Sequence, residues 1–283
     1  MKEAIARVDA GQMKQQVSLV DNQAYVQVND LTKVFFAKKR DSVEAIDDLS
    51  FSVKAGEFIS ILGPSGCGKS TLLKIVAGLI TPTTGQVHIG GKEILAPVTN
   101  VGIVFQQPIL LDWLTVIQNI TLQIEVRKGN LEKGKRTAMD LLEKVGLKGF
   151  ENKYPYELSG GMQQRVSICR ALVHNPPLLL MDEPFGALDA LTRDQMNLDL
   201  QRIWMASGKT VIFITHSMSE AIFLSDRVFV FTPRPTTIAE IVPVNLPRPR
   251  KLSIKETPEF QNDARRITDL LRGMGVLRDV DDE

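Results

Sequence analysis

Cysteine is scarce in this sequence, which excludes one way of stabilising a fold. Cys67 and Cys169 are the only cysteines among 283 residues, so a framework of several disulfides cannot form. An apolar secretory leader is also lacking, because the first residues read MKEAIARVDAGQMKQQ. Together, these two absences predict a protein of a reducing, cytosolic compartment.

Long hydrophobic runs and an excess of charge are lacking too. No apolar stretch approaches the roughly 20 residues that a membrane-spanning helix needs, so we expect contact with a membrane only through a partner. The 34 basic and 33 acidic residues give a net charge of +1, which provides no overall field to attract nucleic acid. The local basic cluster at residues 38–40 is expected to lie in a solvated surface loop.

The apolar residues that are present fall into short runs. They make up 43% of the chain, enough for a sizeable core in one large domain or two closely joined subdomains. Alternation at residues 25–28 and 49–53 predicts half-exposed strands of an antiparallel edge sheet, and the nearly continuous run at 57–62 predicts a buried central strand. Further strands, separated by helical patterns, are predicted at residues 178–182, 211–215 and 228–231. This alternation predicts an α/β fold with a mainly parallel sheet covered by helices.

Four segments depart from this alternation. Residues 1–23 are polar without a sustained period and predict an N-terminal leader, whereas residues 236–283 predict a short C-terminal extension with a frayed acidic end. The helical period between about residues 107 and 172 predicts an inserted α-helical subdomain. We interpret PRPRK, residues 247–251, as a solvated segment of polyproline II conformation.

A glycine-rich segment follows the predicted central strand and precedes a helical pattern. It reads GPSGCGKST and matches G-x-x-x-x-G-K-[ST] through Gly63, Gly68, Lys69 and Ser70. Residues without Cβ bulk let backbone N–H groups approach phosphate oxygens, and the positive end of the following helix favours an anion. Lys69 supplies a charge for the β- and γ-phosphates, and the Ser70 hydroxyl can ligate Mg²⁺. The segment therefore predicts a binding loop for a nucleoside triphosphate.

Acidic and basic side chains end two other predicted strands. Asp182 and Glu183 follow the run LLLM, where Asp182 can hold Mg²⁺ through water and Glu183 can act as general base on the attacking water. Two surface acids that merely end a strand are the alternative. His216 closes the run VIFIT, and strand ends of this kind converge on a ligand crevice. His88 and His174 are expected to be structural.

These motifs, with several others, resemble those of the ATP-binding cassette family, the ATPase subunits of ABC transporters. The resemblance covers about residues 24–235, and the motifs occur in the family's order. Phe35 stands where the family has an aromatic side chain that stacks on adenine, usually Tyr, and Phe36 is a substitute candidate. The other matches are the Walker A loop at 63–71, the Q-loop at Gln106, the signature at residues 158–163, Walker B at Asp182 and Glu183, the D-loop at Asp189 and the switch histidine at His216.

The resemblance implies an ABC-type P-loop ATPase with an antiparallel β edge subdomain and an inserted helical subdomain. It implies that ATP contacts Phe35, Gly63, Pro64, Ser65, Gly66, Cys67, Gly68, Lys69, Ser70, Thr71, Gln106, Ser159, Gly160, Gly161, Asp182, Glu183, Asp189 and His216. It assigns Mg²⁺ to Ser70, Gln106 and Asp182, and catalysis to Glu183, His216, Lys69 and Gln106. Because Glu183 and His216 are both present, every site that this chain forms is expected to hydrolyse ATP.

The partners also follow from the resemblance. The family implies a head-to-tail cassette dimer, formed with an identical or a paralogous subunit, in which each ATP lies between the loop of one subunit and the signature of the other. Two separate permease chains, a substrate-binding protein and a place on the cytoplasmic face of the inner membrane complete the expected importer. The segment ILLDWLTVIQNI and the Pro-rich tail look like the branch that serves nitrate, sulfonate, taurine, bicarbonate or pyrimidine precursors.

Several alternatives stay open at the level of sequence. A soluble ATPase that remodels ribosomes or DNA is one, and a regulatory module that closes on ATP without turnover is another. Trp113, in the apolar segment after Gln106, belongs either to the subdomain core or to a groove that accepts a short permease helix. Cys67 is either an inert filler or a thiol whose modification by a bulky reagent blocks ATP binding.

Overall fold

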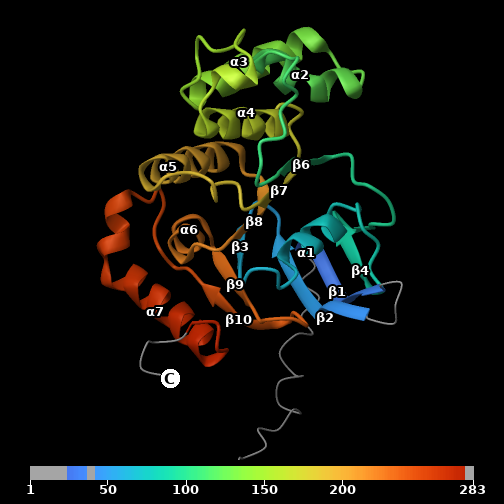
Figure 1. The fold of residues 1–283 in the computed structure, drawn as a ribbon, viewed down its shortest axis with the longest axis vertical. Helices are drawn as coiled ribbons and strands as arrows, with labels where there is room; N and C mark the ends of the chain where they lie inside the picture. Colours follow the sequence, from blue (N-terminus) through green and yellow to red (C-terminus); the bar gives the residue numbers. More distant parts are fainter. Residues whose placement is uncertain (1–23, 37–41, 278–283) are drawn as a thin grey trace, which may run out of the picture.

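The structure describes residues 24–36 and 42–277 and is a computed structural model (Figure 1). The predicted leader at 1–23, the basic cluster at 38–40 and the acidic end at 278–283 lie outside the described residues. In the described part of the chain, no helix is both long and apolar enough to cross a membrane. Both cysteines are free and buried.

An antiparallel sheet forms one edge of the molecule. Its strands are ordered β2-β1-β4-β5 and comprise β1 (Ala24–Phe36), β2 (Ser42–Lys54), β4 (Thr84–Ile89) and β5 (Lys92–Glu93). On β1, Val26 and Val28 are buried, whereas Gln27 between them is half-buried and Asn29 is exposed, as expected when alternate side chains face the core. The half-exposed strands of an antiparallel edge sheet predicted at residues 25–28 and 49–53 are confirmed by β1 and β2, which pair with each other.

A six-stranded, mainly parallel sheet contains the predicted buried strands. Its order is β10-β9-β3-β8-β7-β6, and only β10 pairs in the antiparallel direction. All five residues of β3 are buried, because the strand lies inside the sheet and both of its faces are covered. The strands are β3 (Phe58–Leu62), β6 (Val101–Val104), β7 (Leu178–Asp182), β8 (Thr210–Thr215), β9 (Arg227–Phe231) and β10 (Ile238–Pro243).

The helices surround this sheet, and three of them gather at one end of the molecule. Figure 1 shows α2, α3 and α4 together at the top, beyond α5 and the ends of β6 and β7. The division of the chain at residues 107 and 172 stays a prediction. The helices are α1 (Lys69–Val76), α2 (Val116–Val126), α3 (Leu131–Lys144), η2 (Pro155–Glu157), α4 (Gly160–Leu172), α5 (Ala190–Ser207), α6 (Met218–Leu224), η3 (Leu252–Glu256) and α7 (Pro258–Gly273).

The parallel register brings three strand ends to the same edge of the sheet. Leu62 of β3 pairs with Thr215 of β8, and Asp182 of β7 pairs with Ile214 of β8. The segments that leave β3, β7 and β8 therefore start side by side, although more than a hundred residues separate β3 from the other two strands in sequence. This edge is where the sequence motifs meet.

The interpretation of PRPRK as a solvated segment is wrong for its two arginines, although Pro247, Pro249 and Lys251 are exposed. Arg250 is only 2% exposed, and its guanidinium donates to the carbonyl oxygens of Ile222, Phe223 and Ser225 at 2.8–3.0 Å. These carbonyls belong to the end of α6, where a short helix leaves its last acceptors without internal partners. The extension is therefore part of the folded core rather than a solvated arm.

Candidate functional site

The loop between β3 and α1 has a backbone that glycine alone adopts easily. Gly66 and Gly68 have φ angles of +72° and +129°, and a Cβ on Gly68 would lie 2.9 Å from the carbonyl oxygen of Ala45. Gly68 is the N-cap of α1, which has no side-chain cap and no acidic residue in its first turn. The N–H groups at this helix start are consequently available to an anion.

The ammonium group of Lys69 is buried against the backbone of this loop. It is 5% exposed, and its Nζ donates to the carbonyl oxygens of Gly63 and Pro64 at 2.8 and 2.9 Å. An ammonium group has three N–H donors, so one remains for a ligand. A phosphate against this loop would meet a positive charge that is already positioned.

The donors for a metal ion meet at the next strand end. Ser70 Oγ donates to Asp182 Oδ1 at 2.9 Å, which places a hydroxyl and a carboxylate oxygen together. The pKa of Asp182 is raised, mainly by burial and further by the neighbouring carboxylate of Glu183, while the hydrogen bond from Ser70 opposes this shift. A hydroxyl and a carboxylate are the oxygen ligands that Mg²⁺ accepts while keeping water and phosphate as its other ligands, so the pair fits that ion.

Glu183 is held between two polar side chains. Its Oε2 lies 3.4 Å from His216 Nδ1 and accepts from Gln106 Nε2 at 3.4 Å. Glu183 has a φ of +45°, a left-handed backbone that persists at a non-glycine residue only when its surroundings enforce it; its N–H donates to Ile214 O at 2.9 Å. In the described residues, the Gln106 amide bonds to Glu183 and makes no hydrogen bond to Ser70 or Asp182. The contact of Gln106 with Mg²⁺ stays a prediction.

The signature residues lie elsewhere in the chain. Ser159 is the N-cap of α4 and accepts from Met162 N at 3.3 Å. α4 belongs to the helical group, whereas α1 lies against the sheets (Figure 1). In the described residues, no hydrogen bond or ion pair joins residues 158–163 to residues 63–71. The structure thus does not bring Ser159, Gly160 and Gly161 to the loop of their own chain.

Two further predicted residues lie on the surface. Asp189 is the N-cap of α5 and accepts from Thr192 N at 3.0 Å; the hydrogen bonds from Thr192 lower the pKa of Asp189. Phe35 is 41% exposed, with Lys33 Nζ 5.0 Å from its ring centroid, so it is not a core residue. Phe36 is 80% exposed, which leaves either ring free to stack on a base.

Two residues that sequence reasoning missed hold the phosphate loop from outside. Arg234 Nε donates to the carbonyl oxygen of Gly66, and Thr236 Oγ1 donates to that of Cys67. Both belong to the segment TPRPTT after β9, whose only sequence signal was an interruption by proline. These two donors fix the backbone of the loop at Gly66 and Cys67, directly before α1.

A second missed set connects α4 to the segment that follows Gln106. Arg170 donates to Ile109 O and Pro108 O at 2.7 and 2.9 Å, and Gln164 Nε2 donates to Phe105 O at 3.2 Å. α4 begins with the signature, so its position is tied to that of Gln106. Arg170 lies 61 and 62 residues from its two acceptors in sequence. A contact between residues so far apart leaves no local sequence pattern from which it could be predicted.

The apolar segment after Gln106 points outward. Trp113 and Ile109 are 73% and 56% exposed, so the core interpretation of Trp113 is wrong. The loop is nevertheless firmly held, because the fully buried Asn119 accepts from Leu111 N at 2.8 Å and donates to Leu114 O at 2.9 Å. A fixed loop with exposed apolar side chains is typical of a contact surface for another protein.

Cys67 offers a first test of the loop. Its side chain is 2% exposed and packs in the apolar cluster beneath the loop, which favours the inert filler. We expect a bulky thiol reagent to label Cys67 at least about tenfold more slowly in the native protein than in urea, since reaction requires local opening, and ATP to slow it further. Mass spectrometry of the labelled peptide measures both rates. Fast native labelling that ATP does not change would contradict a buried thiol under the ligand.

Comparisons with known proteins give a consistent result. A family model described as ABC transporter matches residues 46–186. An uncharacterised ABC transporter ATP-binding protein of Methanocaldococcus jannaschii is 47% identical over 87% of this chain and 91% of its own. The taurine import ATP-binding protein of Pelagibacter ubique is 43% identical over 87% and 94% of the two chains. The nitrate import ATP-binding protein of a Synechocystis strain is 42% identical over 88% and 96%.

A solved structure is similar in fold as well. It is the ATP-binding cassette MJ0796, a dimer in a post-hydrolysis state with ADP and Pi bound. Its TM-score is 0.70 at 32% sequence identity, over 78% of this chain and 99% of that chain. The fold class predicted from the sequence is thereby confirmed.

Proposed function

Because the chain belongs to the ABC transporter family, as an ATP-binding ATPase, we propose that it drives an importer of a small anion or organic solute, such as nitrate, a sulfonate, taurine or bicarbonate, through a separate permease. The observation that carries the ATPase is the meeting of Lys69, Ser70, Asp182 and Glu183 at one edge of the sheet. The names of the relatives, which refer to taurine, nitrate and aliphatic sulfonates, support the branch. They leave open which solute is carried.

Each residue of the site has a separate role in ATP hydrolysis. Lys69 and the N–H groups of the loop bind the triphosphate, and Ser70 and Asp182 would hold Mg²⁺, which neutralises phosphate charge when it is bound. Glu183 takes a proton from the attacking water as the water oxygen bonds to the γ-phosphorus and the bond to the β–γ bridging oxygen breaks. His216 and Gln106 keep the Glu183 carboxylate in place at 3.4 Å.

A second cassette would complete the site. Ser159 caps α4 and Gly160 and Gly161 begin it, so their N–H groups have no partner within the helix, yet they lie away from their own loop. In a head-to-tail pair they would meet the nucleotide bound by the partner subunit, so that ATP joins the two subunits and hydrolysis releases them. The dimeric state of the similar solved cassette supports this arrangement. Identical or paralogous partners satisfy it equally.

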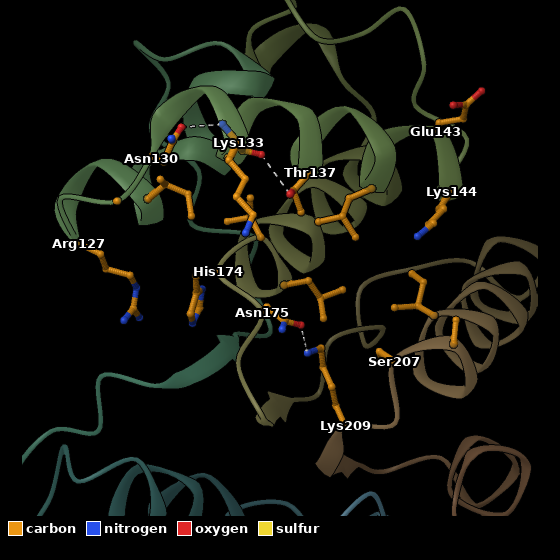
Figure 2. A pocket seen from close by; sticks show the side chains of 18 of the residues that line it. Arg127, Asn130, Lys133, Thr137, Glu143, Lys144, His174, Asn175, Ser207 and Lys209 are labelled. Carbon is orange, nitrogen blue, oxygen red and sulfur yellow. Dashed lines mark hydrogen bonds between the residues drawn. The ribbon is translucent and has the colours of Figure 1, made fainter.

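A basic groove offers the permease a docking surface. A cavity of about 950 Å³ lies between α3, the end of α4 and the end of α5 (Figure 2). The buried Leu141 and Leu172 line it together with Arg127, Lys133 and Lys144. In the described residues, these three cations have no side-chain hydrogen bond or ion pair.

Glu143 and His174 determine how basic this groove is and how it is connected to the nucleotide site. Glu143 is a lining residue of opposite charge, but its carboxylate binds Lys148 at 2.7 Å and points away from the cavity (Figure 2). His174 lines this groove and also the neighbouring cavity beside Arg170; burial lowers the pKa of His174 to about 4, so it is neutral there. We infer that the groove binds a short permease segment with an apolar face and acidic side chains. A shift of this segment would be transmitted to the loop after Gln106 through His174 and Arg170.

Reversing the charge of the groove should weaken this docking. We expect the double variant Lys133→Glu and Lys144→Glu to retain about tenfold less permease during purification, because like charges repel across an interface. The matched control is Lys135→Glu with Arg136→Glu, two reversals on exposed positions of the same helix that do not line the cavity. Equal permease recovery with both double variants would place the docking surface elsewhere.

The transport assignment itself is tested by gentle detergent purification of the chain from its native membrane. We expect a multi-span permease in near-equal amount, which would also place the protein at the cytoplasmic face of the inner membrane. The binding protein that accompanies this permease could then be screened with taurine, nitrate and alkyl sulfonates. Recovery of ribosomes or DNA without a permease would keep the ATPase and overturn the importer.

A further inference from the structure

A buried carboxylate fixes the backbone on both sides of His216. Glu220, on α6, is 4% exposed and accepts a hydrogen bond from Thr215 Oγ1 at 2.5 Å. Thr215 Oγ1 in turn accepts from Ser217 N at 3.0 Å, and Ser217 Oγ caps α6 by accepting from Glu220 N at 3.3 Å. The two neighbours of His216 are thus both connected to Glu220, and a displacement of this carboxylate would displace the histidine.

One arginine connects this carboxylate to the start of α5. Arg193 Nε lies 3.3 Å from Glu220 Oε1, and Arg193 Nη2 donates to the carbonyl oxygen of Leu188 at 2.9 Å. Leu188 immediately precedes Asp189, the exposed N-cap of α5. A planar guanidinium can hold two acceptors in a fixed relative geometry, which an ammonium group cannot. The chain of contacts therefore runs from residues 188–189 through Arg193 and Glu220 to His216.

We propose that Arg193 and Glu220 are positioning residues that couple the segment at residues 188–189 to His216 and hence to Glu183. The coupling rests on the proposed head-to-tail dimer, in which Asp189 would lie at the subunit boundary. Arrival of the second subunit would shift the Leu188 carbonyl, and the guanidinium would transmit that shift to the carboxylate and to the strand end. An ion pair to the buried Glu220 carboxylate and a hydrogen bond from the charged guanidinium to the Leu188 carbonyl are strong enough to transmit such a displacement. Hydrolysis would then depend on closure of the partner as well as on ATP.

The substitution Arg193→Lys separates coupling from simple packing. Lysine keeps a cation for Glu220 but loses the fixed fork that also holds Leu188. In the full-length protein we expect kcat to fall by roughly tenfold to a hundredfold, as misplacement of a positioned group does, while the Kd for a fluorescent ATP analogue stays within about twofold. The Hill coefficient for ATP should approach one. The matched control is Arg202→Lys on the same helix, whose arginine pairs with Asp199 at 3.5 Å, and its kcat should match that of the wild type.

A second pair of variants tests the other end of the chain of contacts. Thr215→Val removes the hydroxyl that bonds Glu220 and should lower kcat, whereas Thr215→Ser keeps the hydroxyl and should restore it. If Arg193→Lys fails to fold, the comparison of these two variants decides the question. Wild-type kcat and Hill coefficient in Arg193→Lys, or equal activity of the two Thr215 variants, would overturn the coupling. An absence of turnover in the wild type would overturn the proposed ATPase before any variant is compared.

Discussion

Replacing Glu183 by Gln should reduce ATP turnover by about 10²- to 10⁴-fold, the usual contribution of a general base, and leave ATP binding intact. The amide has the shape of the carboxylate but cannot accept the proton of the attacking water. The loop, Lys69 and the Ser70–Asp182 pair are untouched by the change. Gln106 and His216 lie at 3.4 Å from Glu183 Oε2 and can still bond to the amide oxygen. Binding and chemistry should therefore separate cleanly.

Two measurements establish that separation. Phosphate release gives the turnover, and size-exclusion chromatography with ATP should show a dimer that persists, because the nucleotide that joins the subunits is no longer removed. Glu132→Gln is the matched control, since Glu132 is an exposed helix residue that, within residues 24–36 and 42–277, pairs only with Lys135. Near-wild-type turnover in Glu183→Gln would show that Glu183 is not the general base and would make His216 the next candidate for that role.

The candidate site was predictable to the extent that its residues form local patterns. A strand followed by a glycine loop and a helix identifies Lys69 and Ser70, and an apolar run followed by two acids identifies Asp182 and Glu183. Their meeting also follows, because parallel strands end at the same edge of a sheet. The left-handed backbone of Glu183, at φ +45°, does not follow, because that conformation is imposed by its surroundings rather than by its own preference.

The contacts that hold the site in place were not predictable in the same way. Arg170, Arg234 and Thr236 donate to backbone carbonyls, and every residue has such a carbonyl. The sequence of the acceptor therefore gives no sign of the contact. A helix position can reveal that a side chain is buried, but it cannot reveal which distant loop the side chain will bind.

PRPRK shows how a local preference can mislead. Proline and arginine favour an extended, hydrated backbone in isolation, and this preference predicts a solvated segment. In the folded protein, the last carbonyls of α6 need donors, and Arg250 provides them together with a contact to Leu246 O at 3.2 Å. Its backbone is held as well, since Arg250 N and O both bond the side chain of Gln201 on α5. Tertiary demand thus overrides the local preference.

Substituting Arg250 by Met should lower the free energy of unfolding by about 3–5 kcal/mol, because several buried carbonyl oxygens lose a charged donor at once. Methionine fills much of the same space but leaves the carbonyls of Ile222, Phe223, Ser225 and Leu246 without their donor, and each unsatisfied buried group costs about 1–3 kcal/mol. The variant no longer has the free-energy cost of burying a charged guanidinium, which offsets part of that loss. Burial lowers the pKa of Arg250 to about 10, so the side chain is still charged at neutral pH.

Urea unfolding, followed by circular dichroism and by the fluorescence of the buried Trp204, measures this loss. Because Arg250 is protonated in the folded state below its pKa of about 10 and in the unfolded state as well, the loss should not vary between roughly pH 6 and pH 8. Arg265→Met, at an exposed position of α7, is the matched control and should change the midpoint little. If Arg250→Met unfolds at the wild-type midpoint, the end of α6 must find other donors or water. The C-terminal extension would then be an attachment to the ATPase rather than a part of its core.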